Sequence, residues 1–214
     1  MEAVRQRAGS LHGLLFLAVV SVVAFGFPPP SWPWYLFLPL LGYVIIVLAF
    51  PPLRRTAPLL SVGRLGGAPL ACAAALAVLT SGVLLGFHAL IRPDVIELGA
   101  RLPVAAFGNI VLAGVCFSVV NAALEELIFR GVLWEVVADE WNPGLALLVT
   151  SALFGIGHLQ GYPPGPLGAG LAGLYGVALG LLRWWAGGLG LTVACHVCAD
   201  ATIFGILLWS GVVG

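Results

Sequence analysis

Charged side chains are scarce in this sequence of 214 residues. Only 8% of the residues are Asp, Glu, Lys or Arg, whereas 61% are hydrophobic; an ordinary soluble domain has about 25% charged residues. Lysine is absent, and the nine basic residues are scattered arginines that form no nucleic-acid-binding patch. The composition excludes a soluble globular protein and predicts that most of the chain lies in a lipid bilayer.

Other common signatures are missing as well. The sequence has no Gly-x-Ser-x-Gly and no His-Glu-x-x-His, so serine-hydrolase and zincin mechanisms have no support. The alternating ten-residue segments of a membrane β-barrel are also absent. We interpret the four cysteines as buried small hydrophobic residues and infer no disulfide framework from them, because all four lie in apolar runs: Cys72, Cys116, Cys195 and Cys198.

What the sequence does contain is a series of apolar runs that approach the roughly 20 residues needed to cross a bilayer. Clusters of charged residues, prolines or glycines separate these runs. The pattern predicts an all-α, polytopic transmembrane bundle of about seven helices, forming a single integral membrane domain over residues 1–214. The predicted spans are 11–27, 33–50, 68–91, 104–137, 143–158, 167–183 and 189–209.

The arginines between the spans are distributed unevenly. Counting alternate loops gives six on one side and two on the other. The positive-inside rule then predicts a multi-pass protein of the cell membrane with a cytoplasmic N-terminus. The same count places Glu125 toward the cytoplasmic end of its span and His158 toward the external end of its own. Either a span boundary is shifted or one span is broken.

The fourth span contains an unusual polar stretch at residues 121–130. A charge at the centre of a span costs about 3 kcal/mol, so such groups are retained where they are paired or have a function. At about 100° per residue, Asn121 and Glu125 share one stripe of the helix. Glu126 aligns with Arg130 in the order that favours an intrahelical pair. We predict that the charges of Glu126 and Arg130 neutralise each other, which leaves Glu125 as the functional carboxylate. The alternative is a closed ion-pair network that includes Glu125.

Histidines occur in two later spans. Phe154 and His158 lie one helical turn apart, and Gly155 and Gly157 between them are small enough to admit another helix or a substrate backbone. A membrane histidine can also simply bond to a neighbouring helix. We therefore treat His158 as a candidate only in combination with the other polar residues.

The last span contains Cys195-His196-Val197-Cys198-Ala199-Asp200. Helical geometry turns the two cysteines nearly opposite to His196 and Asp200, which disfavours a cysteine metal site. His196 and Asp200 lie one helical turn apart, and we interpret the helix face that they share as the functional one. A carboxylate can act as general base for water, and imidazoles can orient that water or donate to an oxyanion. The chemistry suggested is hydrolysis of a peptide bond.

The ordered set Glu125-Glu126-x-x-x-Arg130, Phe154-x-x-x-His158 and His196-x-x-x-Asp200 resembles the three motifs of the CPBP family. This family comprises CAAX prenyl proteases and bacteriocin-processing membrane proteins, also called Abi. The resemblance covers residues 104–209, the expected catalytic core, and implies a glutamate-dependent intramembrane endopeptidase. It makes Glu125 the water-activating glutamate and His158 its partner. The expected catalytic residues are Glu125, His158, His196 and Asp200, supported by Glu126, Arg130, Phe154 and Asn121.

Several alternatives accompany this resemblance. An older description of the family as metalloproteases would make the same residues zinc ligands. We predict metal-free chemistry, because neither histidine has a companion at the short spacing of helical zinc sites. The third motif often ends in asparagine, so Asp200 either stays protonated or orients His196.

The resemblance also implies a substrate class. This is a peptide or protein at the membrane, such as a prenylated CAAX-like tail, a bacteriocin leader or a membrane-anchored sorting tail. The rival functions are a proton-coupled transporter and a catalytically silent immunity or scaffold protein.

Overall fold

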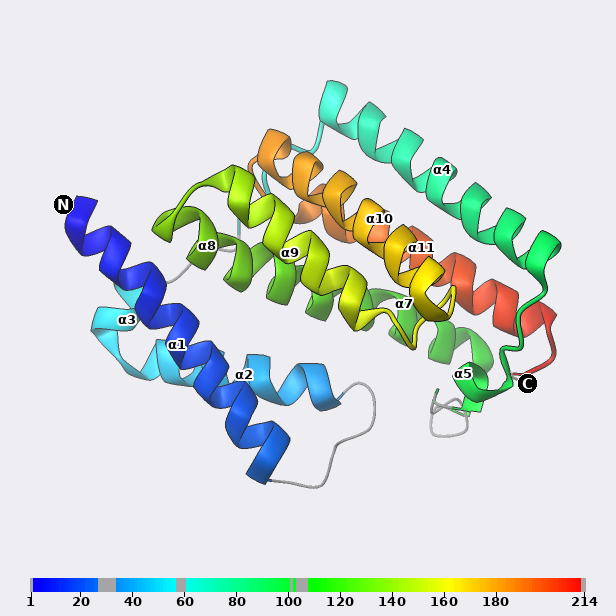
Figure 1. Cartoon of the computed structure of the whole chain (residues 1–214), viewed down its shortest axis with the longest axis horizontal. Helices are drawn as coiled ribbons and strands as arrows, with labels where there is room; N and C mark the ends of the chain where they lie inside the picture. Colours follow the sequence, from blue (N-terminus) through cyan, green and yellow to red (C-terminus); the bar gives the residue numbers. More distant parts are fainter. Residues whose placement is uncertain (1, 27–33, 57–60, 101, 103–107, 213–214) are drawn as a thin grey trace. The chain divides into compact units, whose positions relative to one another are not determined.

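The computed structural model describes residues 2–26, 34–56, 61–100, 102 and 108–212. Within these ranges it describes the side chains of all residues except 2–10, 26, 55 and 56. The described chain is helical and contains no strand (Figure 1). This confirms the predicted all-α class. The physical reason is that a backbone in lipid must satisfy its hydrogen bonds internally, which an α-helix does within one segment.

Each predicted span coincides with helical structure. The predicted ends at residues 27, 33 and 104–107 lie outside the described residues. The elements are α1 (Glu2–Gly26), α2 (Trp34–Ala49), α3 (Pro51–Thr56), α4 (Ala68–Ile91), α5 (Ile96–Ala100), α7 (Ile110–Glu126), η1 (Leu127–Leu133), α8 (Trp134–Glu140), α9 (Pro143–Gly157), α10 (Gly165–Ala186) and α11 (Gly190–Trp209).

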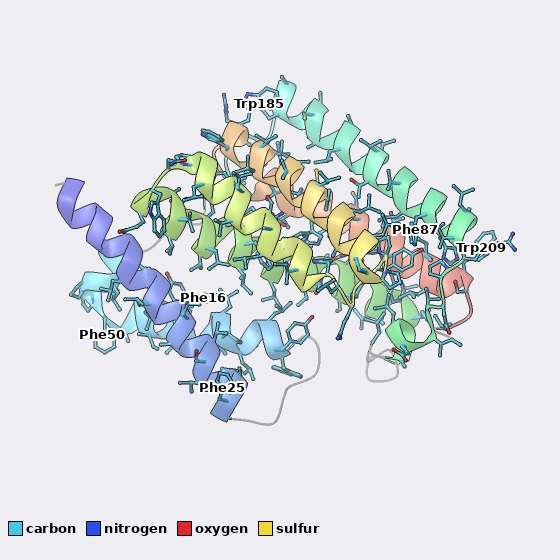
Figure 2. All side chains as sticks on the ribbon, viewed as in Figure 1. Phe16, Phe25, Phe50, Phe87, Trp185 and Trp209 are labelled. Carbon is cyan, nitrogen blue, oxygen red and sulfur yellow. The ribbon has the colours of Figure 1, made fainter. Side chains whose placement is uncertain are left out.

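Four helical stretches of the described chain are long and apolar enough to cross a membrane: Ala68–Ile91, Ile110–Glu140, Gly165–Ala186 and Gly190–Trp209. Shorter apolar helices occupy Leu11–Phe25, Trp34–Ala49 and Pro143–Gly157. Large apolar side chains stand on the surface, among them Phe25 and Trp209, which are 90% and 91% exposed (Figure 2). An apolar surface of this extent requires lipid around it, and the chain is a multi-pass membrane protein.

Prolines and glycines set several helix ends. Pro143 opens α9, as predicted, where its missing N–H leaves no intrahelical bond unmade. Gly187 ends α10 in the left-handed conformation (φ 76°) and donates its N–H to the carbonyl of Arg183 at 2.8 Å. Only glycine adopts this conformation without a steric cost, which explains its place at a helix end.

The chain divides into two compact units. Unit 1 comprises residues 1–60 and 124–150. Its core joins α1 and α2 to the stretch from Leu124 through η1. Gly13 of α1 lets Val136 of α8 approach, since an added Cβ would lie 2.7 Å from the Cγ1 of Val136. The Tyr43 hydroxyl and His12 Nδ1 form a buried hydrogen bond of 3.0 Å. The cluster consists of Phe16, Leu40, Tyr43, Val47, Leu124, Ile128 and Val132.

Unit 2 comprises residues 61–123 and 151–214. Within it α4, α10 and α11 pack together. A hydrogen bond of 2.8 Å between Ser81 of α4 and Thr202 of α11 joins two of these helices. The predicted close approach at Gly155 is confirmed, because its Cα faces the backbone of Gly173 on α10. Unit 2 therefore provides a tightly packed frame for the polar residues of α9 and α11.

Candidate active site

The acidic stretch of unit 1 lies where the helix geometry changes. α7 ends at Glu126, and the chain continues as the π-helix η1 before α8 begins. Short π-helical segments are rare and frequently mark functional sites. Gly131 lies within this π-helix, but glycines also occur inside the α-helices α4 and α10, so it does not signal the change. The π-helix is therefore a feature that the sequence analysis missed.

The predicted Glu126–Arg130 pair is confirmed. Arg130 Nη1 donates to Glu126 Oε1 at 2.8 Å, and both side chains are fully buried. Glu125, the neighbouring carboxylate, is also buried, with 8% of its surface exposed. Two opposite charges removed from water in this way are tolerated because they neutralise each other.

In unit 2, a polar contact joins α7 to α11. Asn121 Nδ2 donates to Asp200 Oδ2 at 3.2 Å. The other carboxylate oxygen, Asp200 Oδ1, lies 3.8 Å from His196 Nε2. All three side chains are buried. The amide thus fixes one oxygen of Asp200, while the second oxygen faces the imidazole.

The aromatic ring of Phe154 contacts both candidate histidines. Its centroid lies 4.2 Å from that of His158 and 5.6 Å from that of His196. His158 Nδ1 lies 2.7 Å from the carbonyl oxygen of Phe154 and therefore carries the proton that this bond requires. The arrangement leaves Nε2 of His158 as the nitrogen with a lone pair. The ring of Tyr175 meets His196 edge-on at 6.1 Å.

These residues line a cavity of about 340 Å³ within unit 2. His158, His196 and Asp200 share it with the two tyrosines Tyr162 and Tyr175. The remaining wall is almost entirely apolar and comes mainly from α4 and α10: Leu76, Leu79, Thr80, Val83, Leu84, Leu171, Ala172, Leu174 and Ala178. Two imidazoles and a carboxylate therefore line an apolar cavity, where their electrostatic interactions are stronger than in water.

The structure thus brings together five of the predicted residues: Asn121, Phe154, His158, His196 and Asp200. Glu125, Glu126 and Arg130 belong to unit 1. The sequence analysis missed Tyr162 and Tyr175. Tyr162 lies in a segment of glycines and prolines between α9 and α10, and Tyr175 stands among small residues of α10, so neither belongs to a pattern that indicates a site.

The folded chain defines a class of protein: a multi-pass helical membrane protein that keeps a set of acids and imidazoles among apolar helices. Residues 107–202 match the family described as type II CAAX prenyl endopeptidase Rce1-like. The match confirms the resemblance to the CPBP family over this part of the chain. No curated protein and no solved structure matches the chain.

Proposed function

We propose that the protein is an intramembrane endopeptidase that hydrolyses a peptide bond with a water molecule activated by Glu125. The observation that carries the proposal is the apolar cavity of unit 2, into which His158 and His196 project beside one carboxylate. The family match adds that the matched segment resembles endopeptidases. A peptide bond presented to this cavity would meet donors in surroundings that strengthen their effect on a developing charge.

In the proposed reaction, Glu125 accepts a proton from water as the water oxygen attacks the carbonyl carbon. The carbonyl oxygen becomes an oxyanion, which an imidazole N–H stabilises. The glutamic acid then returns the proton to the nitrogen as the C–N bond breaks. Glu125 follows Asn121 by one turn of α7, which supports its assignment to the same functional face. His158 orients the water through Nε2.

Asp200 acts in this proposal as a positioning residue for His196. The amide of Asn121 donates to one of its oxygens. The second oxygen attracts a proton on His196 Nε2 at 3.8 Å. Orientation of His196 is thus better supported than a protonated Asp200. Glu126 and Arg130 hold the start of η1 in place through their buried pair.

The substrate we infer is a peptide or protein at the membrane that carries an apolar or lipidated stretch, since the cavity wall is apolar. We further propose that the whole chain is one integral domain of the cell membrane, that residues 104–209 form its catalytic core, and that its N-terminus is cytoplasmic. Tagging the two ends and testing protease access in sealed vesicles would test the orientation.

We propose that the chemistry needs no metal. The support is the spacing of the histidines in the sequence, which is not that of helical zinc sites. The zinc-dependent alternative would need these imidazoles and the carboxylate as ligands, and no group of three such side chains in the described part of the chain is placed to hold a metal ion. A functional test is required. Cleavage should persist in a zinc chelator. Loss of cleavage that added zinc restores would contradict the metal-free mechanism.

The decisive experiment compares cells that produce wild-type protein, Glu125→Gln or Glu140→Gln. Glu140 is an exposed glutamate at the end of α8 and provides the matched control. Proteomic analysis of membrane fractions should show at least one uncleaved precursor with Glu125→Gln and none with Glu140→Gln. The expected loss is at least 100-fold, the scale of removing a general base.

Two other outcomes would each refute the proposal. If Glu125→Gln leaves both the precursors and the cellular phenotype unchanged, the protein is catalytically silent. If the substitution abolishes proton-driven transport into proteoliposomes without affecting any cleavage, the polar groups serve a transporter instead.

A further inference from the structure

A second hollow of unit 2 lies between the C-terminal ends of α4 and α11. It has a volume of about 910 Å³ and is separate in its lining from the histidine cavity. Its walls combine apolar residues of both helices with a few polar groups: Leu85, His88, Ala89, Arg92, Pro93, Thr202, Gly205, Ile206, Trp209 and Ser210. Since this is the volume of a large ligand pocket, the groove can hold a sizeable part of an amphiphile.

The groove lies at the level where two predicted membrane spans end. α4 ends at Ile91, one residue before Arg92, and α11 ends at Trp209. Trp209 is 91% exposed, and Figure 2 shows it at the end of α11. Tryptophan is enriched where the hydrocarbon core meets the headgroups. The groove therefore extends from the headgroup level along apolar helix surface.

Arg92 is the one charged residue in the lining, and no acidic residue faces it there. Within the described part of the chain its guanidinium makes no ion pair, and its backbone N–H donates to the carbonyl of His88 at 3.0 Å. Asp94, nearby in sequence, is engaged with the N–H of Ile96. The groove thus presents a positive charge that the protein leaves for a ligand.

The other polar groups of the groove are bonded within the protein. Thr202 donates to the carbonyl of Cys198 and Ser210 to that of Ile206, each at 2.8 Å. These hydroxyl protons are therefore already in use. Arg92 is left as the principal donor to a ligand.

His88 is bonded on both sides of its ring. Its Nδ1 lies 3.0 Å from the hydroxyl of Tyr162, and its Nε2 lies 3.4 Å from Ser210 Oγ. Burial raises the pKa of Tyr162 to about 12. Because the Ser210 hydroxyl already donates to the carbonyl of Ile206, its oxygen accepts from the imidazole. His88 then donates from Nε2 to Ser210. The imidazole is thus held on both sides as part of the groove wall.

The backbone at Arg92 is a second, independent observation. Arg92 has φ 50° and ψ 54° and is the non-glycine residue with positive φ among the described residues. The left-handed conformation costs a non-glycine residue roughly 1–2 kcal/mol, and glycine usually occupies this position at a helix end. Arg92 thus occupies a position at which glycine would cost less.

We propose that this groove binds an anionic phospholipid, with the phosphate on Arg92 and an acyl chain along Leu85, Ala89 and Ile206. An arginine beside an apolar groove between transmembrane helices attracts an anionic headgroup by its charge. The apolar floor leading away from the cation suits a lipid better than a free phosphate ion. This inference does not depend on the peptidase activity proposed above.

Native mass spectrometry of the full-length protein tests it. The purified chain is given dioleoyl phosphatidylglycerol and dioleoyl phosphatidylcholine in equal amounts, and the ratio of the two adducts is measured. The variants are Arg92→Gln, Arg92→Lys and Arg92→Gly, with Arg54→Gln as a control that removes an exposed arginine of α3. We expect preference for phosphatidylglycerol in wild type, Arg92→Lys and Arg54→Gln. Arg92→Gln and Arg92→Gly should reduce the ratio about five-fold, the factor equivalent to about 1 kcal/mol per arginine near a membrane surface.

Arg92→Gly keeps the test valid if other variants fold poorly, because glycine suits the left-handed backbone and should melt no lower than wild type. An unchanged adduct ratio in this folded variant would show that Arg92 only ends the helix, and would overturn the proposal. So would an equal fall in Arg54→Gln, which would reduce the effect to general surface charge. Displacement of phosphatidylglycerol by a short peptide with a free carboxylate, but not by its amide, would reassign the groove to a peptide end.

Discussion

Gly155 is the position at which the packing of the site helix can be tested most sharply. An alanine Cβ built there would lie 2.7 Å from the carbonyl oxygen of Ala169 and 3.1 Å from Cα of Gly173. Both neighbours are backbone atoms of α10, which cannot rotate away as a side chain would. Gly157, two residues on in the same helix, has open space: a Cβ there meets no atom within 4 Å. The two glycines form a matched pair.

The expected size of the effect follows from two opposing terms. Overpacking a close contact costs about 1–3 kcal/mol, and a backbone clash belongs at the upper end. Replacing a helical glycine with alanine returns roughly 0.5–1 kcal/mol. Gly155→Ala should therefore lower the free energy of unfolding by about 2 kcal/mol. Gly157→Ala should leave it unchanged or raise it by about 0.5 kcal/mol, since this residue ends the helix.

Thermal unfolding in a mild detergent, followed by tryptophan fluorescence, measures the difference. For a chain of this size about 2 kcal/mol corresponds to roughly 4–8 °C in the midpoint. Gly155→Ala should melt lower than wild type by this amount and Gly157→Ala should not. If Gly155→Ala melts at or above Gly157→Ala, the close approach of α9 and α10 is refuted.

Three further predictions concern hydrogen bonds and the buried pair. Arg130→Met should destabilise the protein by about 3–5 kcal/mol, because Glu126 would lose its cationic partner. In the same denaturation assay the double variant Glu126→Leu/Arg130→Met should regain much of this loss. A double variant no more stable than Arg130→Met would contradict the prediction. Asn121→Ala should remove one hydrogen-bond donor from Asp200 and cost about 1–3 kcal/mol in stability. It should also shift the pH profile of any cleavage. An unchanged pH profile would contradict the positioning role of Asp200. Tyr162→Phe should cost about 1 kcal/mol in stability, because it deletes the bond to the histidine of α4, and an equal melting midpoint would show that this bond contributes nothing.

The helices could be predicted closely because lipid leaves the chain few choices. The apolar run 68–91 coincides in both ends with α4, and the run 189–209 differs from α11 by one residue. An apolar segment bounded by proline, glycine or charge must bond its own backbone in the bilayer, and the α-helix does this locally. The π-helix at residues 127–133 was not predictable in this way, because its one glycine, Gly131, is no different from the glycines inside the α-helices α4 and α10.

The candidate site was partly predictable for the same reason. Glu126 and Arg130 lie four residues apart on one helix, so their pairing follows from helical spacing alone. The bond between Asn121 and Asp200 joins residues 79 positions apart and requires α7 and α11 to meet. No spacing rule anticipates it.

The sequence alone determined that this is a helical membrane protein with carboxylates and imidazoles inside its spans, because hydrophobic runs and helical periodicity are local properties. Tertiary packing decided that Phe154 lies against both His158 and His196, that an apolar cavity opens beside them, and that Arg92 borders a separate groove. These features depend on which helices touch. Contacts between helices are fixed by small residues and shape complementarity between distant segments, which a linear pattern does not encode.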